Sequence, residues 1–570
     1  MPTNPTPPPT GPGADKPAGP PPPASEPGST RPGTLTSPAA PPAGPPRPVP
    51  QQAGAMHLPP LHGPWAAHSG FGRRWPGPGR AASAATVIAV PLAGVVGALS
   101  IPLDRAGIGW LITAIAGVAA LIVARAMPHR TPATAPKPLV AWKPQALPRA
   151  RFAWSAATVA LLGVGTFRSA GWLFLLCLCT AVLTGALAVA GGRSLRAMIL
   201  ATVLAPLAGF RSLPWARRGI AAAGRGGGNA LRITATVAVS IALLVVFGSL
   251  FASADAAFAD LIENAFPDVS AGTVARWIFV SLVTTFILGG AAYLRAAPPD
   301  LSGLDGPGKR RVARLEWAVP LTLLVLLFTM FVAVQLTVLF GDSKHVLDTE
   351  GLTYAEYARS GFWQLLVVTG LTLAVLAGAA RWAPRETRTD RLLIRAILGT
   401  LAALTLVIVA SAIHRMDLYA DSYGLTRLRV LVAVCEMWLG LTFVLVLIAG
   451  VRLKALWLPR AVVAAGVLAL LGLAAANPDR LIADRNVTRY EQTDRIDTVY
   501  LSNLSPDAVP ALDRLTGEER ACTLEPIARD LATDADDWRG WNLSRRQARD
   551  RLKADPPVPA KPCWETYGNR

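Results

Sequence analysis

Long apolar stretches recur along the chain, separated by shorter polar connections. Eleven of them are long enough to cross a membrane, since about 20 helical residues at 1.5 Å each span its hydrocarbon core. They lie at 82–103, 107–124, 152–167, 169–191, 231–252, 273–294, 317–340, 362–382, 392–413, 428–450 and 458–476. The pattern predicts an all-α fold, a polytopic integral membrane helical bundle.

A further apolar segment, 197–210, differs from these eleven because it is short and contains Pro206. We expect it to form a half-helix or an interfacial segment rather than another span.

The composition agrees with a membrane protein: 52% of the 570 residues are hydrophobic and only 16% are charged. The net charge of +19 would suit a nucleic-acid partner, but the basic residues are spread over short connections instead of forming one patch. We therefore expect the lipid bilayer, and no nucleic acid, as a partner.

The chain divides into three predicted parts. Residues 1–60 hold 22 of the 50 prolines, so we expect 1–80 to be a disordered, proline-rich cytoplasmic tail. Residues 81–476 form the transmembrane domain, and 477–570 form a small helical domain outside the cytoplasm.

The orientation follows from the basic residues, which are retained on the cytoplasmic side. With the N-terminus inside, the cytoplasmic connections hold 29 Lys and Arg, and the opposite connections hold 6. Eleven spans then place the C-terminus on the extracytoplasmic side.

The C-terminal part holds Cys522 and Cys563, the two cysteines outside the predicted spans. An oxidising compartment permits a disulfide between them, and the alternative is two unpaired thiols. In the same part, Pro506 and Asp507 follow Ser505 as the first turn of a predicted helix, and two further helices are expected near 518–532 and 537–553.

The stretch GLTYAEYARSGFWQLL at 351–366 leads into an apolar run. Thr353 and Glu356 have the spacing of a helix capping box, and Arg359 can pair with Glu356. The aromatic residues suit the membrane surface, so this stretch is expected to begin a helix at the outer interface. A second Gly-Leu-Thr at 424–426 precedes another predicted span.

Glu436 lies inside the predicted span 428–450. A carboxyl group there is costly unless it is protonated, paired or in contact with water, which makes it a candidate for proton or ion coupling. Arg429 and Gln335 are expected near it, and a neutral or paired structural glutamate is the alternative.

Motifs of soluble enzymes are absent: the chain has no HExxH, Walker loop, G-x-S-x-G or C-x-x-C. His345 and His414 each lie near one aspartate, which is too little for a metal site. No catalytic residue, metal or cofactor is assigned, and an enzyme is not the expected class.

Four segments carry a family resemblance: LFGDSKHVLDTEGLTYAEYARSGFWQLL (339–366), LYADSYGLTRLRV (418–430), LIADRNVTRY (481–490) and YLSNLSPDAVPAL (500–512). The chain resembles the bacterial multi-pass membrane family named domain of unknown function 4173, which is related to family 4153. The resemblance covers about 80–515. It implies a polytopic fold in the bacterial plasma membrane and no activity.

Three functions remain open. The first is a transporter or permease for a proton or small solute that uses Glu436, with Glu356 and Arg359 at the outer mouth. The second is a non-catalytic envelope scaffold or sensor that binds protein partners through its proline-rich tail or C-terminal domain. The third is a lipid-linked glycosyltransferase, for which Asp104 is the acidic residue in the first outer loop.

Overall fold

The computed structural model describes residues 75, 77–126, 148–192, 194–225, 229–258, 271–299, 312–340, 362–452, 455–533, 536–561 and 563. Contacts divide the chain into Met1–His62 and Gly63–Arg570, and all described residues belong to the second unit. Within these ranges the secondary structure is helical and contains no strand. The predicted all-α class is therefore confirmed, while most of the proline-rich tail lies outside the described residues.

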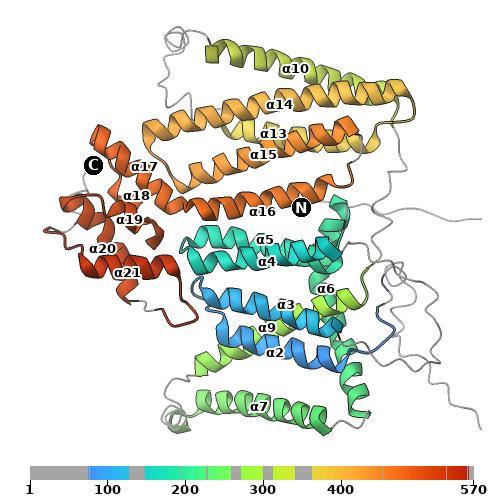
Figure 1. Ribbon diagram of the computed structural model, residues 1–570, viewed down its shortest axis with the longest axis vertical. Coiled ribbons are helices and arrows are strands. Elements are labelled where there is room, and N and C mark those ends of the chain that lie inside the picture. The colour runs from blue at the N-terminus through green and yellow to red at the C-terminus, as the bar shows by residue number, and fades with distance from the viewer. Residues whose placement is uncertain are drawn as a thin grey trace, which may run out of the picture. The chain divides into compact units, whose positions relative to one another are not determined.

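Each of the eleven predicted spans falls on a helix (Figure 1). The helices are α2 (Ala84–Ser100), α3 (Ile108–Ala126), α4 (Pro148–Phe167), α5 (Gly171–Ala190), α7 (Asn229–Ala254), α9 (Ala271–Ala296), α10 (Arg314–Phe340), α13 (Phe362–Trp382), α14 (Arg388–Tyr423), α15 (Arg427–Arg452) and α16 (Leu458–Ala476).

Nine helices in the described part of the chain are long and apolar enough to cross a membrane. Two shorter apolar helices, Ala84–Ser100 and Ile108–Ala124, accompany them. Together, these eleven helices differ from the eleven predicted spans at two places. They do not include α7, and they include α6 (Leu195–Arg225).

The helix α6 contains the segment 197–210 that was expected to be a half-helix. It is longer than expected, with 31 residues, and continues through Pro206 and Pro214. Although its length and composition would allow a span, Figure 1 shows α6 running across its neighbours α2 to α5 instead of alongside them. This direction favours the interfacial interpretation over a span.

The helix α14 is longer than the predicted span 392–413. It has 36 residues, so its length is about 54 Å and exceeds the hydrocarbon core of about 30 Å. Its start is fixed by a capping box between Thr387 and Asp390, and Asp390 also pairs with Arg314 of α10. Its last ten residues were expected to be loop.

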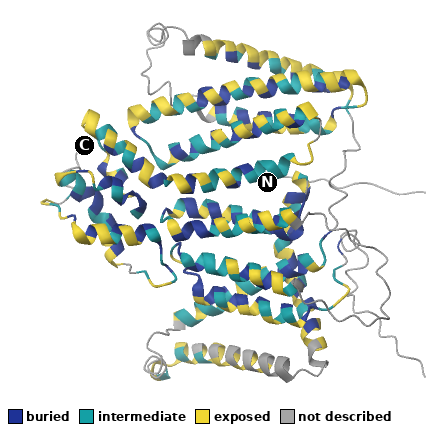
Figure 2. Cartoon of the chain, in the orientation of Figure 1, coloured by how far each residue is buried: buried dark blue, intermediate teal, exposed yellow. Residues whose placement is uncertain are grey.

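The faces of the bundle helices that lack a protein neighbour are apolar. The exposed large apolar residues of α10 run along the helix: Leu315, Val319, Leu323, Leu326, Leu327, Met330, Val334 and Leu336. Figure 2 shows exposed positions alternating with buried ones on α10 and α14. Exposing a continuous apolar face of this kind to water is unfavourable, whereas exposing it to lipid is not. The chain is therefore a multi-pass membrane protein.

Close helix packing inside the bundle depends on small residues. At Gly94 of α2, an added Cβ would lie 2.0 Å from Oγ1 of Thr285 on α9. The absence of a side chain therefore lets these two helices touch, which is a common way of packing membrane helices.

The C-terminal domain follows α16 without a long linker. It consists of α17 (Pro478–Thr493), α18 (Thr498–Ser502), the 3₁₀ helix η2 (Pro506–Ala508), α19 (Val509–Leu512), α20 (Gly517–Thr533) and α21 (Leu543–Ala554). Its apolar core is continuous with residues of α4, α5, α15 and α16, such as Leu161, Leu173, Val430 and Leu473. The domain and these helix ends thus share one core.

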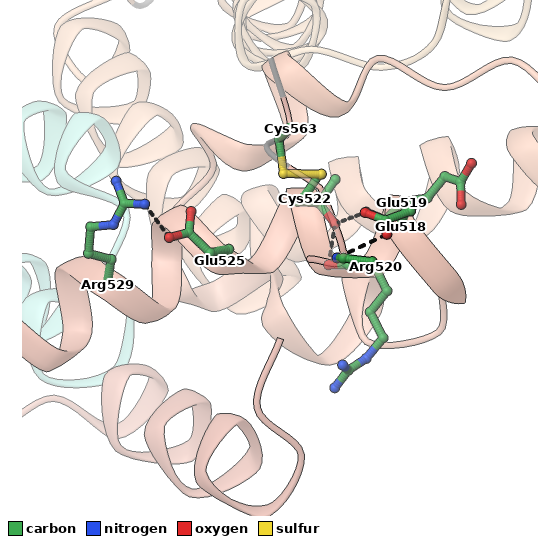
Figure 3. Close-up of a disulfide and its surroundings, with 9 residues drawn as sticks. Glu518, Glu519, Arg520, Cys522, Glu525, Arg529 and Cys563 are labelled. Atoms are coloured by element: carbon green, nitrogen blue, oxygen red, sulfur yellow. Dashed lines mark hydrogen bonds and ion pairs between the residues drawn. A yellow bond between two sulfur atoms is a disulfide. The ribbon is translucent and has the colours of Figure 1, made fainter. Parts of the chain in front are cut away.

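A disulfide joins Cys522 of α20 to Cys563, with a Cα to Cα distance of 5.6 Å (Figure 3). It closes the segment after α21 back onto the domain. The free cysteines Cys177, Cys179 and Cys435 lie in membrane helices.

Candidate functional site at the ends of the membrane helices

Glu436 is packed between helices. Its exposed fraction is 1%, and neither carboxyl oxygen has a hydrogen-bond partner within the described residues. Val432, Leu439 and Phe443 are buried on the same face of α15. The side chain is therefore enclosed by apolar packing.

The residues expected near Glu436 have other partners. The guanidinium of Arg429 donates to the carbonyl oxygen of Gly424 and lies 4.2 Å from the ring centre of Tyr419. Gln335 of α10 accepts hydrogen bonds from Ser411 at 3.2 Å and from Arg415 at 2.5 Å. No hydrogen bond within the described residues joins Glu436 to Arg429 or Gln335. Sequence analysis did not single out Arg415.

Glu356, Arg359 and Thr353 lie outside the described residues. The second Gly-Leu-Thr is described, and Oγ1 of Thr426 accepts a hydrogen bond of 3.4 Å from the backbone N–H of Arg429. Thr426 thus caps the start of α15.

The largest group of buried polar contacts lies elsewhere, where the C-terminal domain meets the membrane helices. At its centre, Asp479 of α17 is fully buried and accepts hydrogen bonds from Nε of Arg427 at 3.1 Å and Nη2 of Arg427 at 2.6 Å. It also accepts from Nε1 of Trp172 at 3.1 Å and from the N–H of Ser505 at 2.9 Å. Every partner comes from a different element.

The ionised form of Asp479 is stabilised by its hydrogen-bond partners. Burial would raise the pKa of this carboxyl group, but hydrogen bonds from the Arg427 guanidinium and from Ser505 favour the charged form. Their combined effect holds the pKa of Asp479 below its ordinary value. The Asp479 and Arg427 pair is therefore ionic at neutral pH.

Asp507 of η2 caps the start of α5. Its Oδ2 accepts hydrogen bonds from the backbone N–H groups of Ser169 at 2.8 Å and Ala170 at 2.9 Å, and from the Ser169 hydroxyl at 2.7 Å. These two N–H groups immediately precede the first turn of α5, where the helix dipole favours a negative charge. Because Ala170 offers no side-chain cap, this one comes from the C-terminal domain.

The end of α4 is capped from α21. Asn542 donates from Nδ2 to the carbonyl oxygens of Gly165 at 2.8 Å and Arg168 at 2.9 Å, and Ser544 donates to that of Phe167 at 2.9 Å. Arg168 in turn donates to the carbonyl oxygen of Ala474 at 2.6 Å, near the end of α16.

The starts of α3 and α15 are also held by the domain. The N–H groups of Ile108 and Gly109 donate to the carbonyl oxygens of Trp541 and Arg539, both at 3.0 Å. The N–H of Arg427 donates to the hydroxyl of Tyr500 at 2.7 Å. Four membrane helices, α3, α4, α5 and α15, therefore begin or end on groups of the C-terminal domain.

The connection between α14 and α15 is clamped by α17. Asn486 donates from Nδ2 to the carbonyl oxygen of Leu425 at 2.8 Å, and Arg489 donates to that of Ser422 at 2.8 Å. Gly424 has φ +78°, and a Cβ there would lie 2.2 Å from Oδ1 of Asn486. Only glycine fits this turn without strain.

Asp104, in the loop between α2 and α3, pairs with Arg105 at 2.5 Å. Arg105 also contacts Asp536 of the C-terminal domain at 3.3 Å. Among the described residues, no group of three or more His, Cys, Asp or Glu side chains is arranged to hold a metal ion. The contacts described above position the ends of the membrane helices.

No curated protein and no solved structure matches the chain. Residues 156–515 match a family described as a domain of unknown function, DUF4153. The match runs from α4 to the segment after α19, so it includes Arg427, Asp479 and Asp507. The resemblance to family 4153 is thereby confirmed, whereas membership in family 4173 is not, and the chain belongs to the DUF4153 family.

Proposed function

We propose that the chain is a non-catalytic envelope scaffold or sensor whose C-terminal domain holds a fixed position on the membrane helices. The observation that carries this proposal is the capping of α3, α4, α5 and α15 by groups of that domain. Because the attachment is made at several helix ends, force or ligand binding at the domain is passed directly to the bundle.

We place the C-terminal domain on the extracytoplasmic side of the bacterial plasma membrane. The three connections that touch the domain, at 101–107, 168–170 and 424–426, hold few basic residues, whereas the connections predicted for the cytoplasm hold 29 Lys and Arg. Protein partners would then meet the C-terminal domain outside the cell and the proline-rich tail inside it.

The orientation can be tested by labelling intact cells with a membrane-impermeant maleimide. Val499→Cys replaces an exposed residue of α18 and should be labelled directly. Arg217→Cys on α6 serves as the matched control, and it should be labelled only after the cells are permeabilised. The reverse pattern would contradict the placement.

The function itself can be tested by complementing a strain that lacks the chain. A scaffold or sensor requires the domain, so deletion of residues 477–570 and the capping variant Asp507→Ala should both fail to complement. Glu436→Gln should complement fully. Each variant is compared at equal abundance in the membrane fraction, and full complementation by the deletion variant would overturn the proposal.

A transporter for a proton or small solute is the second candidate, and Glu436 favours it. A carboxyl group that is 1% exposed and has no hydrogen-bond partner within the described residues is a suitable place for a proton or a cation to bind. In the same experiment a transporter predicts the opposite result: Glu436→Gln fails to complement, and any phenotype that depends on pH is lost.

A further inference from the structure

The helix α6 has an apolar outer face that its protein neighbours leave exposed. Between residues 195 and 213 its exposed large apolar residues recur every three or four positions: Leu195, Ile199, Val203, Leu207, Phe210 and Leu213. Because an α-helix completes a turn in about 3.6 residues, these side chains lie on one face of α6. Neither of the functions proposed above uses this face.

The opposite face of α6 is packed against the bundle. Five of its residues are buried in one apolar cluster together with residues of α2 and α9: Ala197, Ala201, Leu204, Ala208 and Trp215. Where α6 crosses α9, a Cβ added to Gly290 would lie 2.7 Å from the backbone nitrogen of Gly209. One side of α6 is thus fixed to protein, and the exposed apolar side requires another environment.

Arginines flank the apolar face, and α6 contains no acidic residue. Arg196 lies near the start of the face, and Arg217 and Arg218 follow its end. All three are exposed, and none makes a hydrogen bond or an ion pair with a residue that the structure describes. Arg211 differs from them, because it donates to the carbonyl oxygen of Trp75 at 2.9 Å and lies over the ring of Trp75 at 4.5 Å.

The direction of α6 places both features at the membrane surface. The helix runs across its neighbours α2 to α5 (Figure 1), so it lies along the surface rather than through it. A helix at this depth meets acyl chains on one side and lipid headgroups on the other. Arginine suits the boundary, because its stem packs on apolar surface while its guanidinium reaches the headgroups.

The charge of α6 favours anionic lipid over a second copy of the chain. In a two-fold contact the same surface meets itself, so arginines would face arginines, and α6 has no carboxylate to neutralise them. The phosphate of an anionic lipid supplies the missing negative charge and accepts hydrogen bonds from guanidinium groups.

We propose that the exposed face of α6 binds anionic phospholipids, with the apolar side chains of 195–213 among the acyl chains and with Arg196, Arg217 and Arg218 at the phosphate groups. This surface goes beyond the scaffold or sensor function and does not depend on it, because lipid binding is measured on the purified chain and complementation is measured in cells. It is also independent of the orientation, since both leaflets of a nanodisc contain the same lipids.

The environment of the apolar face can be measured with a spin label on Val203→Cys. The full chain carries Cys177→Ala, Cys179→Ala and Cys435→Ala, and it is placed in phospholipid nanodiscs. Oxygen concentrates in lipid, so the label should be more accessible to oxygen than to a water-soluble nickel chelate. The exposed position Val499→Cys of the C-terminal domain, labelled in the same way, calibrates contact with water.

Two results with this label would overturn the proposal. Higher accessibility to nickel than to oxygen would place the face in water. Low accessibility to both would place it against protein, such as a second copy of the chain.

Thermal unfolding in nanodiscs of phosphatidylcholine, with or without phosphatidylglycerol, measures the preference for anionic lipid. Phosphatidylglycerol should raise the unfolding midpoint of the unmodified chain, since a ligand of the folded state stabilises it. The combined variant Arg196→Gln, Arg217→Gln and Arg218→Gln should lose most of this increase. No increase in the unmodified chain, or an equal increase in the variant, would contradict the proposal.

Two further variants separate the site from net charge. Replacing the same three arginines by lysine keeps the positive charge and should preserve the increase. The combined variant Arg485→Gln, Arg495→Gln and Arg546→Gln removes the same charge at exposed positions of the C-terminal domain and should also preserve it. If this control loses as much of the increase as the α6 variant, net charge alone is responsible and the site on α6 is refuted.

Discussion

The carboxylate of Asp479 accepts a hydrogen bond of 2.6 Å from Nη2 of Arg427. This contact joins the first turn of α17 to the first turn of α15, and Asp479 extends it to α5 through Trp172. An ion pair buried in this way fixes the position of each element, because any displacement would leave a charge without its partner. The C-terminal domain is therefore an integral part of the membrane bundle.

Replacing Asp479 should destabilise this junction strongly. In Asp479→Ala the Arg427 guanidinium loses its partner, and breaking a buried pair costs about 3–5 kcal/mol. Because Arg427 is about one-third exposed, we expect the lower end, about 3 kcal/mol. Thermal unfolding followed by tryptophan fluorescence measures the change. Asp484→Ala, which removes more exposed ion pairs on the same helix, should shift the midpoint far less.

The same pair predicts a dependence of stability on pH. The pKa of Asp479 is lowered in the folded protein, so the folded state favours the ionised form more than the unfolded state does. This contribution is present above the pKa of an unfolded aspartate, about 3.9, and is lost as the pH falls through the lower folded value. Protease resistance of the C-terminal domain should thus decline below about pH 4. In Asp479→Asn, which cannot ionise at this position, the protease resistance should decline less between about pH 5 and pH 3 than it does in the unmodified chain.

The cap of α5 gives a separate prediction. Asp507→Ala removes the acceptor for the N–H groups of Ser169 and Ala170, and loss of a helix cap costs about 1–2 kcal/mol. Asp507→Asn keeps an acceptor oxygen of similar shape and should cost less. Thermal unfolding of the two variants provides the comparison, and equal losses would show that the charge matters more than the hydrogen bonds.

The sequence was sufficient to predict where the apolar helices of the bundle lie, because an apolar run is a local property, although the candidate spans differ from the prediction at α6 and α7. The predicted span 317–340, for example, lies within α10, and its exposed apolar face continues along the helix. The end of α14 was missed because the polar residues 414–423 resemble a loop, whereas Arg489 of α17 and the clamped turn at Gly424 hold that end in place.

The polar junction could not be predicted from local patterns. Asp507 was assigned to the first turn of its own helix, yet its partners Ser169 and Ala170 lie more than 330 positions earlier. Only the folded bundle brings them together. A signal was nevertheless present, because Asp479 follows a predicted span by three residues, and a carboxylate this close to the membrane suggests a partner on a neighbouring helix.

The disulfide of the C-terminal domain gives a fourth prediction. The two cysteines are 41 positions apart, and closing a loop of this length stabilises the folded state by about 4 kcal/mol in the chain-entropy model. Cys522→Ser should lower the unfolding midpoint of the domain. In native membranes denatured without reductant, neither Cys522 nor Cys563 should react with an alkylating reagent. Labelling of both would show that they are unpaired.

Glu436 gives the last prediction, in which stability and function oppose each other. Both of its carboxyl oxygens lack a hydrogen-bond partner within the described residues, and the side chain is buried with Val432, Leu439 and Phe443 on one face of α15. An unsatisfied buried polar group costs about 1–3 kcal/mol, so Glu436→Leu should raise the thermal unfolding midpoint in detergent. Met437→Leu, at the neighbouring exposed position, controls for the added leucine and should leave the midpoint nearly unchanged. If Glu436→Leu is more stable and still complements the deletion strain, the carboxyl group has no coupling role. If it is more stable but inactive, the chain retains a costly group because its function uses it, and transport becomes the better-supported candidate.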